Sequence, residues 1–155
     1  MREIKWKTLL ICFVIVYGIA FAGSLFTDAN SSWYESVKPA ITPPNYVFPI
    51  VWNILFFLIA LALYYSWTDK KSKKLKSKIA TVFGINLSLN FLWGILFFKM
   101  QNPIISFFEL IILWISIIIL ISTTSKINRH YSYLLIPYLL WVSFAGILNY
   151  LIAVS

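Results

Sequence analysis

Five apolar runs of membrane-crossing length constrain the fold of this chain more than any other feature. A helix needs roughly 20 apolar residues to cross the hydrocarbon core of a bilayer. The runs that reach this length cover residues 8–26, 47–67, 79–98, 103–122 and 132–154. Because a helix satisfies its own backbone hydrogen bonds inside lipid, each run predicts a transmembrane helix. We expect an all-α membrane protein, a five-helix bundle that forms a single domain over residues 1–155.

The composition excludes a soluble domain. Of the 155 residues, 61% are hydrophobic and only 12% are charged. A small soluble globule must solvate most of its surface, which this balance does not allow. The lipid bilayer is therefore the first partner of the chain, and the short connections leave no room for an extramembrane domain.

The positive charges fall on alternate connections between the runs. Residues 69–78 carry six of the thirteen basic residues, others precede the first run, and Lys126 and Arg129 join the last two runs. The other connections hold only Lys38 and Lys99. By the positive-inside rule, we expect a multi-pass protein of the cell membrane with a cytoplasmic N-terminus and an outside C-terminus. The same placement favours contacts with lipid headgroups over a nucleic-acid partner.

The connection over residues 27–46 contains more proline and aromatic residues than a simple linker needs. Pro39, Pro43 and Pro44 stiffen its centre, and tryptophans mark the two ends of the stretch from Trp33 to Trp52. Tryptophan offers a rigid amphipathic surface, whereas a flexible connector needs only a few small polar residues. We therefore predict an ordered lid on the outer face of the bundle.

Three of the runs each place a tryptophan and small, polar or aromatic residues on one helical face. These faces contain Phe48, Trp52 and Phe56, then Asn86, Asn90 and Trp93, and then Trp141, Ala145 and Leu148. An amide that faces hydrocarbon is costly, so both asparagines should point into the bundle. There they either hydrogen-bond between helices or contact a ligand. Indole rings could stack on a planar apolar ligand that the amides orient, although such aromatic faces also occur as plain core.

Other residues in the runs have local interpretations. Asn102 and Pro103 predict a helix start by capping, and Pro137 predicts a kink in the last helix. Small residues four apart, Gly18 with Ala22 and Ala20 with Ser24, suit close helix contact.

Glu109 is the only carboxylate within the five runs. An intramembrane carboxylate is a candidate functional group. The alternative is a scaffold role, either protonated or bonded to amides and hydroxyls. A proton relay would need a second charged residue or a histidine within the runs, and they contain no other Asp, Glu, His, Lys or Arg.

The chain offers little for conventional catalysis. It has one cysteine, Cys12, in the first run and one histidine, His130, in a loop. A metal site needs several converging ligands, and hydrolytic chemistry needs a nucleophile beside a base. We expect no metal site, no cofactor and no conventional enzyme.

Residues along nearly the whole chain resemble one family. They are Trp33, Tyr34, Lys38, Pro39, Pro43, Pro44, Phe48, Val51, Trp52, Asn90, Trp93, Phe97, Phe98, Pro137, Tyr138, Trp141, Phe144, Ala145, Leu148 and Asn149. In this order they are similar to the TspO/MBR family of tryptophan-rich sensory proteins and translocator proteins, also called peripheral-type benzodiazepine receptors. The resemblance points to a bacterial member.

The resemblance implies five transmembrane helices, usually in a homodimer, and a ligand cavity beneath the first loop. It implies binding of protoporphyrin IX or a related tetrapyrrole and of synthetic benzodiazepine and isoquinoline ligands, with a role in regulation or photo-oxidative stress. Light-dependent breakdown of protoporphyrin is part of the implied activity, and the tryptophans tied to it match Trp52 and Trp141. Ligand contacts of the family match Trp33, Pro44, Asn90, Trp93, Ala145 and Leu148.

Two further expectations complete the sequence-based hypothesis. The cholesterol motif of the family needs a basic residue soon after Tyr150, and residues 151–155 contain none, so we expect no specific sterol binding. The alternative to a binding protein is a small transporter of porphyrin-like or other hydrophobic molecules, in which Glu109 would be the coupling residue.

Overall fold

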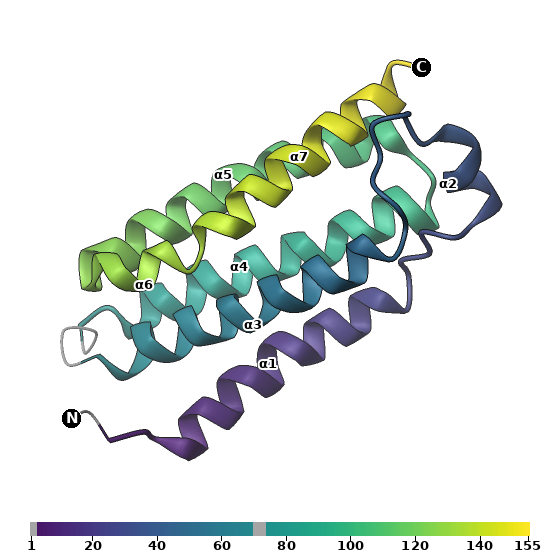
Figure 1. Ribbon diagram of the computed structural model, residues 1–155. Coiled ribbons are helices and arrows are strands. Elements are labelled where there is room, and N and C mark those ends of the chain that lie inside the picture. Colours follow the sequence, from purple (N-terminus) through teal and green to yellow (C-terminus); the bar gives the residue numbers. More distant parts are fainter. Residues whose placement is uncertain (1–2, 70–73) are drawn as a thin grey trace.

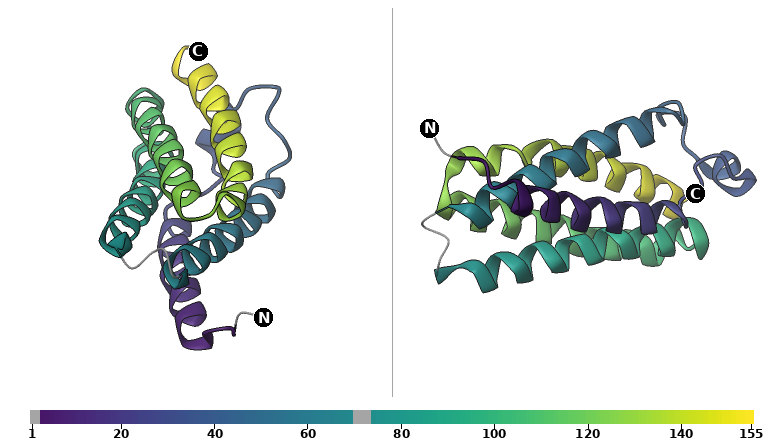
Figure 2. Two further views of the ribbon diagram at one scale, coloured as in Figure 1. Left: turned by 90° about the vertical axis from the view of Figure 1, so that its left-hand side faces the viewer. Right: turned by 90° about the horizontal axis from the view of Figure 1, so that it is seen from below.

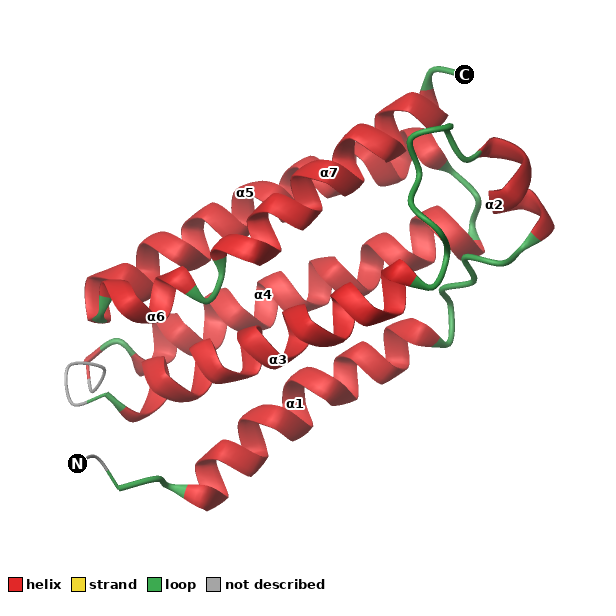
Figure 3. Cartoon of the chain, viewed as in Figure 1, coloured by secondary structure: helices red, strands yellow, loops and turns green. Residues whose placement is uncertain are grey.

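A computed structural model describes residues 3–69 and 74–155, and this part of the chain contains helices and loops only (Figure 1; Figure 3). The elements in chain order are α1 (Trp6–Ser24), α2 (Ser32–Val37), α3 (Val47–Thr68), α4 (Lys76–Gly94), the π-helical turn η2 (Ile95–Lys99), α5 (Pro103–Ile127), α6 (Arg129–Tyr133) and α7 (Ile136–Ala153).

Five helical segments are long and apolar enough to cross a membrane. They are Trp6–Ser24, Val47–Thr68, Lys76–Lys99, Pro103–Ile127 and Arg129–Ala153. Their outward-facing residues are mostly Ile, Leu, Val and Phe, which suits contact with lipid. The prediction of an all-α protein with five membrane-spanning helices is confirmed.

The long helices lie side by side, and α1 stands at one edge of the bundle (Figure 1; Figure 2). Helix α1 packs on α3 and α4, whereas α5 packs on α4 and α7. The lid helix α2 and the C-terminus lie at one end of the bundle, which we call the lid end. The start of α1, the end of α3 and helix α6 lie at the opposite end.

Helix α5 extends further than the sequence suggested. We expected the fourth helix to end at residue 122, where the apolar run ends. The helix instead continues to Ile127, and Thr123 and Thr124 are buried within it. Buried threonines pack like valines in a helix whose neighbours cover them, so hydropathy alone places this end too early.

The last membrane segment is interrupted rather than kinked. Helix α6 ends at Tyr133, and α7 begins at Ile136 with Pro137 in its first turn. A first-turn proline loses no intrahelical hydrogen bond, because the N–H there would have no partner. The predicted kink at Pro137 is therefore wrong, since this proline starts a helix. The prediction for Asn102 is confirmed, because its Oδ1 accepts a hydrogen bond from the Ile105 N–H at 3.0 Å.

A chain of buried polar groups joins three helices. Asn86 on α4 is completely buried, and its Nδ2 donates to Ser116 Oγ on α5 at 2.8 Å. Tyr138 on α7 donates its hydroxyl proton to Asn86 Oδ1 at 3.2 Å. Asn90 Nδ2 in turn donates to Tyr138 Oη at 3.2 Å. The amides therefore point into the bundle, as expected, and Asn86 holds helices together.

Candidate functional site

A cavity of about 470 Å³ opens at the lid end of the bundle, within the range typical of small-molecule sites. Helices α1, α3, α4 and α7 form its walls, and the segment between α1 and α3, which lies at this end of the bundle (Figure 1), also contributes to its lining. Its lining includes Ile19, Ala20, Gly23, Ser24, Thr27, Asp28, Asn30, Tyr34, Asn45, Tyr46, Phe48, Trp52, Phe56, Asn90, Phe91, Trp93, Phe97, Trp141, Ala145, Leu148, Asn149 and Ile152.

Most of the residues predicted from helical spacing meet at this cavity. The predicted residues that line it are Phe48, Trp52, Phe56, Asn90, Trp93, Trp141, Ala145 and Leu148. Three others do not. Asn86 lies in the core between α4 and α5, Pro44 is exposed in the lid, and Trp33 packs edge-on against Phe97 with ring centroids 5.4 Å apart.

Aromatic rings brace one another around the cavity. Trp52 stacks on Phe56 with centroids 5.4 Å apart and an interplanar angle of 28°. Trp141 meets Phe48 edge-on at 5.8 Å. These contacts fix the indole planes before any ligand enters, and stacked and edge-on aromatic pairs are each worth about 0.5–1.5 kcal/mol beyond area burial.

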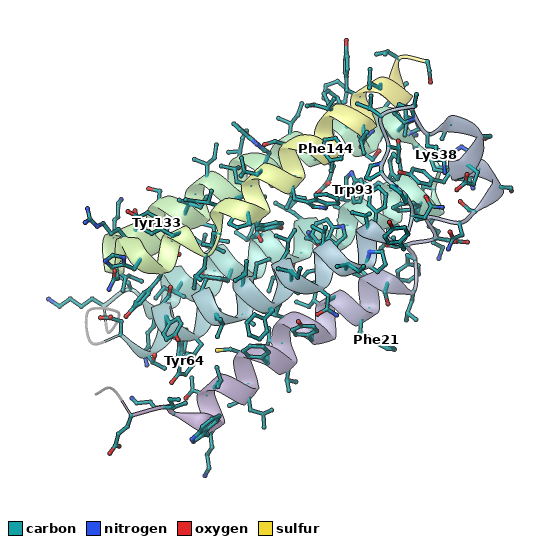
Figure 4. All side chains as sticks on the ribbon, in the orientation of Figure 1. Phe21, Lys38, Tyr64, Trp93, Tyr133 and Phe144 are labelled. Carbon is teal, nitrogen blue, oxygen red and sulfur yellow. The ribbon has the colours of Figure 1, made fainter. Side chains whose placement is uncertain are left out.

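Trp93 is fixed by ring contacts and by its N–H. Its ring stacks on Phe97 at 5.1 Å with an interplanar angle of 14°, and its Nε1 donates to Asn149 Oδ1 at 3.1 Å. Asn149 Nδ2 donates to the Pro103 carbonyl at 2.7 Å, which ties α7 to the start of α5. Figure 4 shows Trp93 between the helices near the lid end. Sequence spacing placed Trp93 correctly but did not reveal that Asn149 holds it.

Two polar groups at the cavity have unused hydrogen-bonding capacity. The Nε1 of Trp141 is buried and has no acceptor within the described part of the chain. Asn90 uses its Nδ2 on Tyr138, and no described donor reaches its Oδ1. Asn90 Oδ1 therefore offers a ligand one acceptor on largely apolar walls, whereas the Trp141 N–H is covered by protein atoms.

The lid is ordered and anchored by Tyr34. Its ring packs edge-on against Phe97 at 6.0 Å and Phe48 at 6.3 Å, and at 5.4 Å from Phe98. The side chain is 3% exposed, and this burial raises the pKa of its phenol to about 12. Ser31 caps α2 by accepting the Tyr34 N–H at 3.3 Å. Sequence reasoning predicted the ordered lid but missed the short helix and its anchor.

Polar contacts secure the outer face of the lid. Lys38 Nζ lies 2.6 Å from Glu35 Oε2, and Asn45 Nδ2 donates to Glu35 Oε1 at 2.6 Å. The hydrogen bond from Lys38, followed by the one from Asn45, lowers the pKa of Glu35 below its ordinary value. A second bond from Asn45 Nδ2, to Asn30 Oδ1 at 3.0 Å, joins the two ends of the lid.

Helix α1 contributes a wall that the sequence interpretation did not assign. Ala20, Gly23 and Ser24 line the cavity, although small residues on this helix were expected to serve close helix contact. An added Cβ at Gly23 would lie 3.6 Å from Phe91 Cδ2, an ordinary van der Waals distance, so the approach of α1 to α4 does not require glycine here. The spacing of small residues was therefore the available signal, but it does not distinguish a helix contact from a cavity wall.

Glu109 lies outside the cavity lining. It is 6% exposed on α5, and neither of its carboxylate oxygens has a hydrogen-bond partner among the described residues. Ser106 and Ser116 share its buried face. Of the two forms of the scaffold role, the one with bonds to amides or hydroxyls has no such bond within the described part of the chain.

The described residues contain no group of three or more His, Cys, Asp or Glu side chains that could hold a metal ion. Cys12 is buried in α1, and His130 lies on α6 at the end of the bundle away from the lid.

Five apolar helices and an aromatic cavity under an ordered lid define a multi-pass helical membrane protein with a small-molecule-sized site. Residues 10–154 match the model of the TspO/MBR family. The "Tryptophan-rich protein TspO" of Chlorobaculum tepidum is 38% identical over 147 residues, which cover 94% of this chain and 93% of that protein. The protein of the same name from Archaeoglobus fulgidus is 42% identical over 139 residues, covering 88% and 89%.

A more distant relative is the "Translocator protein" of Bos taurus, which is 26% identical over 133 residues, covering 84% of this chain and 79% of that protein. This chain belongs to the TspO/MBR family.

Proposed function

We propose that the protein binds planar, largely apolar molecules in the lid-end cavity, with protoporphyrin IX or a related tetrapyrrole as the natural ligand class. The observation that carries this proposal is the pair of braced indoles, Trp52 and Trp141, on walls that also offer the Asn90 amide oxygen. A tetrapyrrole has a flat apolar face and central nitrogens that both donate and accept hydrogen bonds. Synthetic benzodiazepine and isoquinoline ligands share the flat aromatic shape.

Within this proposal, the wall residues contact the ligand directly and the other predicted residues support them. Phe48, Phe56, Trp93, Ala145 and Leu148 supply apolar surface. Trp33 and Pro44 belong to the lid, and Asn86 acts through Tyr138, which it orients toward Asn90. The ligand is iron-free, because His130 lies at the opposite end of the bundle and offers no axial nitrogen.

Titration of protoporphyrin IX in detergent micelles tests this site through quenching of tryptophan fluorescence. We expect Trp52→Phe and Trp141→Phe each to weaken binding, because each removes indole surface from the cavity. Trp6→Phe is the matched control, since Trp6 is 70% exposed on α1 near the end away from the lid. Binding that is unchanged in the Trp52→Phe/Trp141→Phe double variant would remove this cavity as the site.

The biological role that we propose is regulation or protection from photo-oxidation, with light-dependent breakdown of the porphyrin as a related activity. Trp52 and Trp141 are the photochemical candidates, because electron-rich indoles beside a photosensitiser can exchange electrons with it. The protein needs no bound cofactor for this. Illumination with excess protoporphyrin should consume more than one equivalent per protein, whereas the loss of a single equivalent would indicate stoichiometric damage.

We also propose the orientation that the charges indicate, in the cell membrane, with the lid end outside and the N-terminus in the cytoplasm. Lys5, Lys7, Lys126 and Arg129 lie at or near the end away from the lid, as the positive-inside rule requires. Lys70, Lys71 and Lys73, on which the prediction also rested, lie outside the described residues. The bundle acts as a single domain.

A homodimer is part of the same proposal. An added Cβ at Gly18 or at Gly84 meets no atom within 4 Å, so each position leaves room for a second helix to approach closely. Cross-linking in native membranes, with bulky substitutions at each glycine, tests which helix face is used.

A transporter of porphyrin-like or other hydrophobic molecules is the second candidate function. The observation that favours it is the buried, unpartnered carboxyl of Glu109 in a membrane-spanning helix. Proton-coupled uptake into proteoliposomes should be lost in Glu109→Gln. Uptake that survives this substitution would exclude coupling through Glu109.

A further inference from the structure

We infer that a buried hydrogen-bond network, which begins at Ser116 on α5, makes Asn90 present its amide oxygen to the cavity. The site then prefers flat ligands that carry an N–H or O–H group beside Asn90. This inference rests on the proposed function and adds a hydrogen-bonding requirement to its ligand class. The network runs from Ser116 through Asn86 and Tyr138 to Asn90, across α5, α4 and α7. Of these four residues, only Asn90 lines the cavity.

The direction of the network follows from Ser116. A serine hydroxyl has one hydrogen, and Ser116 Oγ donates it to the Leu113 carbonyl at 2.6 Å. Its oxygen therefore accepts from Asn86, whose Nδ2 lies 2.8 Å away. The Asn86 amide oxygen consequently faces Tyr138 and accepts the phenol proton at 3.2 Å. Tyr138 then has no proton left, so Asn90 meets it as a donor, through Nδ2 at 3.2 Å.

Asn90 therefore turns its nitrogen toward the network and keeps its oxygen for the cavity. Its Oδ1 accepts no hydrogen bond from a described residue and is not enclosed by protein atoms. Asn86 and Tyr138 are at most 1% exposed, so the inner links of the network are shielded from water. A ligand N–H or O–H beside Oδ1 gains a partner. An acceptor placed there faces another acceptor, and both stay without a hydrogen bond.

The opposite direction of the network has one hydrogen bond fewer. If Asn90 turned its nitrogen to the cavity, its oxygen would take the Tyr138 proton, and Asn86 would have to donate to Tyr138. Ser116 would then give its single hydrogen to Asn86 and lose the bond to the Leu113 carbonyl. One hydrogen bond shifts such an equilibrium about three- to tenfold. Ser116 thus sets the polarity of a cavity that it does not line.

The requirement applies to the part of a ligand beside Asn90 and leaves its other substituents free. A free-base tetrapyrrole has N–H groups of its own, and its carboxylates lie at the periphery of the ring system. The proposed ligand class therefore meets the requirement. The network also contacts the indole wall, because Trp52 packs edge-on against Tyr138 with ring centroids 6.2 Å apart.

Carbazole and dibenzofuran test this polarity, because they share their size and flat shape but carry an N–H and an ether oxygen, respectively, at the same position. Each is titrated into the whole chain in uncharged detergent and followed by calorimetry, with empty micelles as the blank. We expect the wild type to bind carbazole more tightly. Ser116→Ala should lower the carbazole-to-dibenzofuran affinity ratio about three- to tenfold, because the two directions then have nearly equal numbers of hydrogen bonds. Most of this change should be a gain in affinity for dibenzofuran, which a general loss of structure would not produce.

A second variant and two controls isolate the network. Tyr138→Phe keeps the buried ring and removes only the hydroxyl, so Asn90 can turn either way and the ratio should fall by a similar factor. Ser116→Thr keeps a hydroxyl that can bond to the same carbonyl and should retain the wild-type ratio. Ser125→Ala is the matched control, because Ser125 on α5 also donates to a carbonyl three residues earlier, at 2.9 Å, but is exposed.

The outcomes separate this inference from the proposed function. An unchanged ratio in Ser116→Ala and Tyr138→Phe, with both probes bound, overturns the polarity and leaves the cavity as the binding site. A ratio that falls in Tyr138→Phe but not in Ser116→Ala overturns the role of Ser116. Equal losses of affinity for both probes, or the same change in Ser125→Ala, would show a structural effect and would overturn the inference. Failure of both probes to bind the wild type also overturns it, and the porphyrin titration then decides the proposed function by itself.

Discussion

Tyr34→Ala should release the lid from the bundle. The ring of Tyr34 is almost completely buried and packs against Phe48, Phe97 and Phe98. Truncating a buried aromatic residue to alanine costs about 3–5 kcal/mol. When the lid opens, Tyr34 leaves all three rings, so almost all of this free energy belongs to the opening equilibrium. The lower value, ~3 kcal/mol, corresponds to a roughly hundredfold larger open population, because 1.36 kcal/mol is tenfold.

Amide hydrogen exchange of the lid measures this change directly. The N–H groups of Glu35 and Lys38 bond to the Ser31 and Tyr34 carbonyls at 3.0 and 2.9 Å, so their exchange reports opening of α2. We expect exchange at both positions to rise about a hundredfold in Tyr34→Ala, and ligand release to become faster. Tyr46→Ala is the matched control, since Tyr46 also lines the cavity but is 67% exposed. Unchanged exchange in Tyr34→Ala would refute the anchoring role.

Three further predictions concern stability and pH. The pKa of Glu35 is lowered from 4.5 in the folded protein. Its contribution to lid stability is therefore present above 4.5 and is lost as pH falls through the lowered pKa. Amide exchange in the lid, corrected for the intrinsic rate, should accelerate on acidification in the wild type and not in Glu35→Gln. Asn86→Leu removes hydrogen bonds to Ser116 and Tyr138 and should lower the free energy of unfolding by about 1–2 kcal/mol in a denaturing-detergent titration, whereas an unchanged midpoint would contradict a structural role. Glu109→Gln removes a carboxyl that has no described partner, so the free energy of unfolding should fall by no more than about 0.5 kcal/mol, and a larger loss would reveal a partner for this group.

Hydropathy and helical spacing predicted the number of spanning helices and most of the cavity wall, because both follow from local sequence. Trp52, Asn90 and Trp141 each share a helical face with neighbours that also reach the cavity. Spacing cannot decide what a face meets once the helices pack. Asn86 and Asn90 are four residues apart on one face, yet one lies in the core and the other lines the cavity.

The features that sequence reasoning missed depend on contacts between distant segments. The π-helical turn η2 directly follows Gly94, the last residue of α4. Gly94 lies close to Thr27, because an added Cβ would be only 3.2 Å from Thr27 Oγ1. After η2, Gln101 has a φ of 50°, a backbone conformation that residues other than glycine rarely adopt. Gln101 lies in the connection that leads to α5. Neither feature leaves a recognisable mark in residue spacing, because apolar periodicity reports which face of a helix is covered and not local departures from α-helical geometry.

The shallow packing of α1 has a consequence for how this protein can change. Only Cys12 and Val16 of α1 are buried, yet its last two turns form one wall of the cavity. Substitutions on the other walls disturb a packed core, whereas most positions on α1 carry little of the total stability. Substitutions on α1 can therefore change which ligands the cavity binds at a small cost in the free energy of folding. This helix is the natural place to look for differences in specificity between related chains, and the first to randomise when redirecting the cavity to a new small molecule.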